Sequence, residues 1–229
     1  MANGMTNPDS GGYASFPNYS QTSPAARILL IRHGQVEWNA KSAYTGWTDI
    51  DLNERGIREA EIIADRLSQV QLAAVYSSDL IRAKRTADII AKKHDLTPIE
   101  EPDLREINYG MWEGLDAEKI TSQFGRDIFE KWKADPENIE IPGGESFGIL
   151  RDRVVPAINR IAERHRGETT AVVAHKSVNR VLVCYFLGLP VGRYKEIKQD
   201  NTAINSLLFE GNRVVVETVN DVCHIQKMH

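Results

Sequence analysis

The feature that most constrains the fold is the alternation of short apolar runs with longer segments of helical periodicity. Continuous apolar runs occupy 28–31 and 73–76, and 169–174 begins with two threonines and continues as a third run. Each segment is short enough to be a strand buried on both faces of a sheet. Between these runs, apolar residues recur every three or four positions, as they do in amphipathic helices. Strands that alternate with helices predict an α/β three-layer domain with a mainly parallel central sheet.

Capping residues and turn residues indicate where the helices and the last strands should begin and end. Asn53 can cap a helix that runs to about Leu67, and Ser77 or Ser78 can cap the helix after the second strand. The same patterns predict further elements, namely two helical pieces after 114, helices over 146–164 and 176–187, and hairpin strands over 203–209 and 214–219.

The first 26 residues differ in composition from the rest of the chain. They contain no Lys, Arg, Leu, Ile or Val, so they cannot bury enough apolar surface to offset the entropy of ordering. We therefore expect a disordered tail over 1–26 and a single domain over 27–229. The tail lacks the basic and apolar regions of a secretion signal, and no later stretch approaches the ~20 apolar residues of a membrane span. With only two cysteines, these features predict a cytoplasmic protein without membrane partners.

The charge balance bears on the class of partner. There are 28 Lys and Arg residues against 32 Asp and Glu residues, which gives a formal charge of −4. Nucleic-acid-binding proteins usually carry a broad basic surface, so no nucleic-acid partner is expected. The six histidines are candidates for chemistry at neutral pH, because imidazole changes its protonation state near that pH.

Chemically useful side chains follow three of the predicted strands. Arg32-His33-Gly34 follows the first strand, Arg82 lies shortly after the second, and His175 follows the third. Ligands of an open parallel sheet bind beyond the carboxyl ends of its strands, so these residues should meet at one edge. Arginine presents a planar fork that matches phosphate oxygens, and neighbouring cations should keep His33 neutral and nucleophilic. The sequence therefore predicts a phosphate pocket with a nucleophile at its base.

Several ordered segments carry a resemblance to a known family. They are Leu29-Leu30-Ile31-Arg32-His33-Gly34, Thr45-Gly46-Trp47, Ser77-Ser78-Asp79-Leu80-Ile81-Arg82-Ala83, Leu104-Arg105-Glu106, Gly143-Gly144-Glu145-Ser146 and Val173-Ala174-His175. From about residue 27 to residue 224, the chain resembles the histidine phosphatase superfamily, the phosphoglycerate-mutase-like proteins. The resemblance implies a phosphoglycerate-mutase-like fold and a phosphoryl group carried on histidine, with no metal and no other cofactor.

The resemblance also implies a role for individual residues. His33 matches the nucleophile that becomes phosphohistidine, and Glu106 matches the carboxyl group that protonates the leaving oxygen. The residues that match the phosphoryl-binding pocket are Arg32, Arg82 and His175, with Asn39 as a further polar contact. Substrate contacts are expected from Thr45, Gly46 and Tyr109. A nearby carboxyl group, that of Glu113, is an alternative candidate for the acid.

The same resemblance covers phosphatases and mutases, which differ in what receives the phosphoryl group. The glycolytic mutases carry a lysine at the position of Ala117, an Arg-Arg pair in a longer segment near Trp132, and His-Gly-Asn where this chain has His175-Lys176-Ser177. These three departures favour water as the acceptor. The predicted activity is a metal-independent phosphomonoesterase acting on a small phosphorylated metabolite, with a cofactor-dependent phosphoglycerate mutase as the alternative. Lys176 either adds a cation to the substrate rim or is a solvated residue of the first helical turn.

Two other classes of function remain as alternatives. A binding module would hold a phosphorylated ligand in the pocket without turnover, but such a module has no evident need for an intact nucleophile. A metal-dependent hydrolase would need closely spaced ligands, yet no His-x-His or His-Glu-x-x-His sequence occurs, and adjacent arginines would repel a divalent ion. The family precedent is also compatible with a homodimer.

Overall fold

The computed structural model describes residues 24–225 of the chain. Its strands and helices are, in chain order, β1 (Ala26–Arg32), α1 (Glu37–Ala40), α2 (Glu54–Leu67), β2 (Ala74–Ser77), α3 (Ile81–Lys92), β3 (Ile99–Glu100), α4 (Ala117–Phe124), α5 (Arg126–Ala134), α6 (Phe147–Arg164), β4 (Thr169–Ala174), α7 (Lys176–Phe186), β5 (Ile204–Glu210) and β6 (Arg213–Asp221). Three short 3₁₀ helices complete the described elements, η1 (Pro102–Leu104), η2 (Gly110–Trp112) and η3 (Val191–Glu196).

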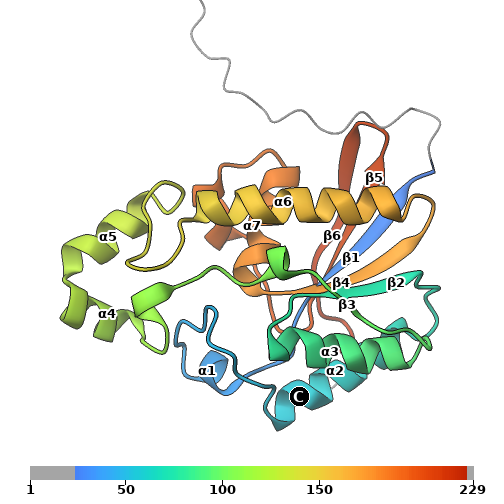
Figure 1. The fold of residues 1–229 in the computed structure, drawn as a ribbon, viewed down its shortest axis with the longest axis horizontal. Coiled ribbons are helices and arrows are strands. Elements are labelled where there is room, and N and C mark those ends of the chain that lie inside the picture. Colours follow the sequence, from blue (N-terminus) through green and yellow to red (C-terminus); the bar gives the residue numbers. More distant parts are fainter. Residues whose placement is uncertain (1–23, 226–229) are drawn as a thin grey trace, which may run out of the picture.

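The strands form one six-stranded sheet in the order β3-β2-β4-β1-β5-β6 (Figure 1). Strands β3, β2, β4 and β1 pair in parallel, whereas β5 pairs antiparallel with β1 and β6 antiparallel with β5. The carboxyl ends of β1, β2 and β4 therefore meet at one edge of the sheet. The predicted α/β architecture with a mainly parallel sheet and a C-terminal hairpin is confirmed.

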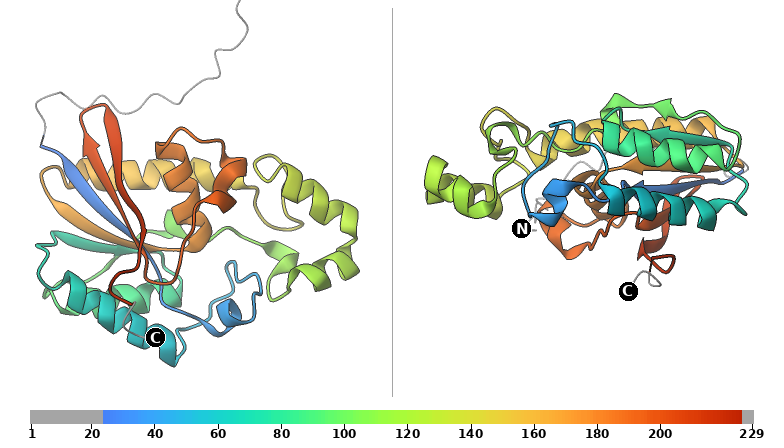
Figure 2. Two further views of the ribbon diagram at one scale, coloured as in Figure 1. Left: turned by 180° about the vertical axis from the view of Figure 1, so that it is seen from behind. Right: turned by 90° about the horizontal axis from the view of Figure 1, so that it is seen from below.

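Helices cover both faces of the sheet, which makes the three expected layers. One apolar cluster joins α6 and α7 to the sheet through residues such as Leu30 and Val172, and a second joins α2 and α3 through Ile31 and Val173. Successive residues of a strand thus point to opposite layers, which explains why these strands are apolar without alternation. Helices α4 and α5 project to one side of the sheet in every view (Figures 1 and 2).

Of the two capping predictions, one is confirmed and the other is wrong. The side chain of Asn53 accepts a hydrogen bond from Gly56 N at 2.8 Å and begins α2. Ser77 or Ser78 was expected to cap α3, but that helix begins three residues later, at Ile81. The reason is that Ser78 N still donates to Val173 O of the sheet at 3.1 Å. The first turn of α3 is instead capped from a distance, because Asp49 accepts from Ile81 N at 2.7 Å.

The expected tail lies almost entirely outside the described residues. Its last residue, Ala26, belongs instead to the domain, where it begins β1, is 2 % exposed and pairs with Phe209. Within residues 24–225, no helix is long and apolar enough to cross a membrane.

Candidate active site

A pocket of about 360 Å³ opens at the carboxyl ends of β1, β2 and β4. It is lined by seven of the nine predicted site residues, namely Arg32, His33, Asn39, Thr45, Arg82, Glu106 and Tyr109. The eighth, His175, lies directly behind His33, with the two ring centroids 5.1 Å apart. The ninth, Gly46, lies outside the lining. The structure therefore brings together residues that are up to 143 positions apart in the sequence, from Arg32 to His175 (175 − 32 = 143).

The imidazole of His33 is held in one orientation at the base of the pocket. It is 3 % exposed, and its Nδ1 lies 2.7 Å from Gly34 O. Because a carbonyl oxygen can only accept, Nδ1 carries the proton and Nε2 keeps its lone pair. Burial, together with the charges of Arg82 and Arg32, holds the pKa of His33 well below its ordinary value of 6.5. The ring is thus a neutral imidazole with one nitrogen available as a nucleophile.

His175 has an unusual environment for a buried polar side chain. It is fully buried, and within the described part of the chain neither of its ring nitrogens has a hydrogen-bond partner. Burial and the charge of Arg82 lower its pKa well below 6.5. Native proteins seldom leave buried polar atoms without partners, so the two nitrogens are suited to a ligand in the pocket.

The two arginines predicted for the pocket, Arg32 and Arg82, are buried and are held by backbone carbonyl groups. Arg32 donates through Nη1 to Gln199 O at 2.8 Å, and Arg82 donates to Thr48 O at 2.9 Å and to Gly46 O at 2.6 Å. The Nε atoms of both side chains have no partner among residues 24–225. Burial lowers the pKa of Arg32 to about 10, so its guanidinium group remains charged at neutral pH. Carbonyl groups fix these side chains without neutralising them, which leaves their charge for an anion.

Gly46 does not line the pocket, although the sequence predicted it as a substrate contact. It was expected to contact substrate, but its carbonyl group holds Arg82 and its backbone has a φ of +54°. A Cβ atom here would lie 2.0 Å from Oε1 of Glu113. The Glu113 carboxylate accepts from Trp47 N at 2.7 Å and Thr48 N at 2.8 Å. Gly46 therefore allows the loop to pack under Arg82.

The carboxyl group of Glu106 lies in the pocket, whereas that of Glu113 does not. Glu106 accepts from Ser177 N, at 3.2 Å to each oxygen, and from Ile107 N at 2.9 Å. Ser177 is the second residue of α7, so Glu106 supplies the cap that His175, at the N-cap position, does not. Of the two carboxyl groups considered, Glu106 is the one positioned for chemistry in the pocket.

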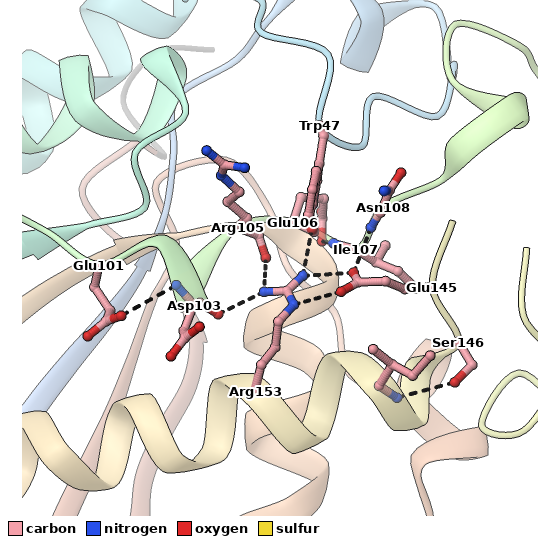
Figure 3. Close-up of polar contacts among 11 residues, drawn as sticks. Trp47, Glu101, Asp103, Arg105, Glu106, Ile107, Asn108, Glu145, Ser146 and Arg153 are labelled. Atoms are coloured by element: carbon pink, nitrogen blue, oxygen red, sulfur yellow. Dashed lines mark hydrogen bonds and ion pairs between the residues drawn. The ribbon is translucent and has the colours of Figure 1, made fainter. Parts of the chain in front are cut away.

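The backbone around Glu106 is held by side chains from elsewhere in the fold (Figure 3). Arg153 of α6 donates to the carbonyl groups of Asp103, Arg105 and Glu106 at 2.7, 2.7 and 2.8 Å. It also forms a two-point ion pair with Glu145, at 2.9 Å for each contact. Trp47 donates through Nε1 to Glu106 O at 2.7 Å. The segment that carries Glu106 is thus fixed independently of the pocket itself.

Several lining residues were not identified as site residues from the sequence. Asn201 donates to His33 O at 2.9 Å and so holds the backbone of the histidine. Arg180 and Lys195 add positive charge to the pocket, and so does Lys176, one of the two roles considered for it. The available signal was the spacing of Lys176 and Arg180, which lie four residues apart and hence on one face of α7. Lys195 lies on η3, whose approach to α7 has no local sequence pattern.

Comparison with known proteins agrees with this geometry. The sequence model of the histidine phosphatase superfamily (branch 1) matches residues 28–222. Phosphoserine phosphatase 1 of Hydrogenobacter thermophilus is 33 % identical over 203 residues, which cover 89 % of this chain and 96 % of that protein. Phosphoglycerate mutase-like protein 4 of Arabidopsis thaliana is 37 % identical over 206 residues, with 88 % of both chains covered. The metal-independent phosphoserine phosphatase of the same plant is 35 % identical, covering 90 % of this chain and 86 % of its own.

Solved structures show the same fold. Bacillus stearothermophilus YhfR superposes with a TM-score of 0.82 at 30 % identity, covering 88 % of this chain and all (100 %) of that one. Phosphoserine phosphatase of Entamoeba histolytica, in complex with 3-phosphoglyceric acid, superposes with a TM-score of 0.78 at 26 % identity, covering 87 % and 99 %. The chain belongs to the histidine phosphatase superfamily, and it is an enzyme of the phosphatase type.

Proposed function

We propose that this chain hydrolyses small phosphorylated metabolites through a phosphohistidine intermediate on His33. The observation that carries the proposal is the state of His33, which is a neutral imidazole with Nδ1 engaged at 2.7 Å by Gly34 O and Nε2 available. The walls around it supply two fixed guanidinium groups, from Arg32 and Arg82, which suit phosphate oxygens. His175, with two buried and unpartnered nitrogens, completes the proposed phosphoryl site.

In the first proposed step, Nε2 of His33 attacks phosphorus and the bond from phosphorus to the ester oxygen breaks. Glu106, in its protonated form, gives its proton to the leaving oxygen, so the product departs as a neutral alcohol. The guanidinium groups of Arg32 and Arg82, with a ring N–H of His175, hold the phosphoryl oxygens as their charge redistributes. The cycle uses no metal, because these fixed donors supply the positive charge.

In the second proposed step, water attacks the phosphorus of phosphohistidine. Glu106, now a carboxylate, takes the proton from the water, and the phosphorus–nitrogen bond breaks. Inorganic phosphate leaves, and His33 and Glu106 return to their starting states. One carboxyl group therefore acts as acid in the first step and as base in the second, and it must stay beside the reacting oxygen in both.

The acceptor is proposed to be water, as the sequence comparison with mutases suggested. A relative of 37 % identity is named mutase-like, and that resemblance keeps a cofactor-dependent phosphoglycerate mutase as the second candidate. Rapid interconversion of 2- and 3-phosphoglycerate after priming with bisphosphoglycerate would establish the mutase instead. Phosphate release without such interconversion supports the phosphatase. Tight phosphate-ester binding with no turnover would identify a binding module.

Location and assembly are further parts of the proposal. Both cysteines are free, Cys184 buried and Cys223 exposed, which suits a reducing cytoplasm. We propose a cytoplasmic enzyme and take a homodimer as the assembly to test. Fractionation of cells and sedimentation velocity at micromolar concentration check these two points, and a monomeric boundary would exclude the dimer.

The proposal is tested by hydrolysis of p-nitrophenyl phosphate in the presence of EDTA. Activity should persist in the chelator, whereas its loss and restoration by a divalent metal would overturn the metal-free chemistry. His33→Ala should abolish an acid-labile ³²P label on the enzyme. His94→Ala, which removes a histidine outside the pocket, is the matched control and should keep the label. A label that persists in His33→Ala would assign the nucleophile to another residue.

A further inference from the structure

The charged side chains of the pocket do not balance. Among residues 24–225, the cations that line it come from five residues, Arg32, Arg82, Lys176, Arg180 and Lys195, and the single carboxyl group is that of Glu106. None of these five cations forms an ion pair with another side chain among residues 24–225. Their close neighbours do, since Arg193 pairs with Glu196 at 2.6 Å and Lys198 with Asp200 at 2.8 Å. The pocket is thus lined by cations that no carboxylate side chain neutralises through an ion pair within the described residues.

The five cations divide into an inner and an outer group. Arg32 and Arg82 follow β1 and β2 and belong to the proposed phosphoryl site. The outer group, formed by Lys176, Arg180 and Lys195, comes from α7 and η3, which pack against each other. A phosphoryl group bound by the inner group leaves the charge of the outer group unbalanced. The outer group thus calls for its own explanation.

Two members of the outer group, Arg180 and Lys195, are held by neighbouring groups. Arg180 donates through Nε to Ile197 O at 2.7 Å, and its guanidinium lies 5.9 Å from the ring centroid of Tyr194. The ammonium group of Lys195 lies 5.5 Å from the same centroid. Two cations therefore lie over one aromatic ring, and within residues 24–225 the Nη atoms of Arg180 have no hydrogen-bond partner.

Bringing these cations together has an electrostatic cost. Partial burial of the ammonium group, followed by the charges of Arg32 and Arg180, lowers the pKa of Lys176 to about 8, although much of the side chain is exposed. The pKa of Lys195 is lowered by partial burial and by Lys133 and Arg180. A negative charge bound between these groups would relieve the repulsion. The empty pocket is in this respect matched to an anion.

We propose that Lys176, Arg180 and Lys195 form a subsite for a second anionic group of the substrate. The substrate would then carry a carboxylate or a second phosphate a few bonds from the phosphoryl group that is transferred. A pocket of about 360 Å³ is at the small end for ligand sites and fits a compact molecule of this kind. This inference rests on the proposed phosphatase activity and names the substrate class for the same site.

The same charges select against an ammonium group on the substrate. Glu106 is the one carboxyl group of the lining, and its oxygens already accept from Ser177 N and Ile107 N. A substrate ammonium would meet the outer cations without a counter-charge. A phosphorylated hydroxy acid should therefore be preferred to the corresponding phosphorylated amino acid, even though two relatives are named phosphoserine phosphatases.

Three matched substrates test the subsite. 3-Phosphoglycerate and glycerol 3-phosphate differ in one group, a carboxylate against a hydroxymethyl, and O-phosphoserine replaces a hydroxyl of the first by an ammonium. We expect kcat/KM for 3-phosphoglycerate to exceed the other two by about tenfold or more, the usual size of a charge-assisted contact. Fructose 1,6-bisphosphate against fructose 6-phosphate shows whether a second phosphate serves in place of the carboxylate.

Single variants assign the effect to residues. Arg180→Gln, Lys176→Gln and Lys195→Gln should each reduce the preference for 3-phosphoglycerate over glycerol 3-phosphate severalfold, and Arg180→Lys should retain part of it. Arg193→Gln is the matched control, because Arg193 lies on the same η3, carries the same charge and is outside the pocket. A preference that survives in all three variants, or falls equally in the control, would overturn the assignment.

The outcomes separate this inference from the proposed function. The enzyme could hydrolyse p-nitrophenyl phosphate through His33 and yet prefer neither 3-phosphoglycerate to glycerol 3-phosphate nor fructose 1,6-bisphosphate to fructose 6-phosphate. In that case the subsite is wrong and the phosphatase activity stands. If O-phosphoserine exceeds 3-phosphoglycerate, selection against an ammonium group is wrong. If neither hydrolysis nor a phosphoenzyme is found, the proposed function fails together with the subsite.

Discussion

Arg153 offers the sharpest test of how this site is built, because it acts on Glu106 without entering the pocket. Its guanidinium makes five contacts, with the carbonyl groups of Asp103, Arg105 and Glu106 and with both oxygens of Glu145, at 2.7–2.9 Å (Figure 3). Arg153→Met keeps much of the apolar stem and removes all five donors. The variant leaves a carboxylate and three carbonyl groups without this partner.

The size of the effect follows from how well the pair is buried. The side chains of Arg153 and Glu145 are 17 % and 12 % exposed. Breaking a fully buried pair costs about 3–5 kcal/mol, because a charge is left without a partner. Some exposure lets water replace part of the lost contacts, so we expect a loss of about 2–4 kcal/mol in the free energy of unfolding. Glu145 keeps one contact, with Asn108 N at 2.9 Å.

Urea unfolding of both proteins measures this difference, and Arg160→Met is the matched control. Arg160 lies on the same helix, is 54 % exposed, and pairs with Glu101 and Asp103 at the surface. Exposed pairs contribute about 1 kcal/mol or less, so the control should lose little stability. A loss below about 1 kcal/mol in Arg153→Met would refute the energetic reasoning.

Positioning of Glu106 has its own measure in the leaving group. Nitrophenolate departs without protonation, whereas an alkoxide does not, so displacement of Glu106 should reduce kcat for an alkyl phosphate more than for p-nitrophenyl phosphate. The measured quantity is kcat for the alkyl phosphate divided by kcat for p-nitrophenyl phosphate. We expect this ratio to fall about tenfold in Arg153→Met, measured at a temperature at which the variant remains folded. Equal reductions for both substrates would show that Arg153 stabilises the fold and does not position the acid.

Three further results are expected. Partial burial and neighbouring arginines lower the pKa of Lys176 to about 8, so the preference for a substrate with a second anion should decline between pH 7 and pH 9. Lys176→Gln should remove that decline, and a decline of the same size in the variant would contradict the assignment to Lys176. The pKa values of His33 and His175 are depressed by burial, so the unfolded chain binds protons first as the pH falls below 6.5. Urea unfolding should therefore show about 1 kcal/mol lower stability per group at pH 5.5 than at pH 7, with a smaller difference in His33→Gln; equal stability at both pH values would refute this. Gly46→Ala forces a Cβ to 2.0 Å from Glu113 at a φ of +54°, and should cost about 1–3 kcal/mol and reduce kcat/KM; wild-type values for both would contradict the packing argument.

The parts of the fold that could be predicted are those that depend on neighbours in sequence. Segments such as 28–31 and 171–174 are apolar throughout because each is covered on both faces, and the strand ends therefore mark the edge where Arg32, His33 and His175 meet. The Asn53 cap is likewise local, since its side chain reaches the third residue of its own helix. The start of α3 could not be found in this way, because its cap comes from Asp49 in another loop.

The outer cations were harder to predict because their function depends on packing between elements. Lys176 and Arg180 share a face of α7, but a charged helix face is most often solvated, and no local pattern directs it to a pocket. The pocket wall arises when η3 packs on α7 and brings Tyr194 and Lys195 beside Arg180. A net charge of −4 likewise conceals a local excess of positive charge.

The proposed chemistry and the proposed selection of substrate depend on different parts of the fold. The proposed chemistry depends on strand ends, whose geometry is fixed by a sheet that cannot change without loss of the core, whereas the second anion would be bound by residues of α7 and η3 at the rim. A substitution at Lys176, Arg180 or Lys195 alters the charge offered to a substrate and leaves His33, Arg32 and Arg82 in place. If this argument is correct, replacing the three cations of the outer group should change the ratio of kcat/KM values between substrates by a larger factor than the rate of dephosphorylation of His33. The reason is that water, and not the departed substrate, is the reactant in that second step.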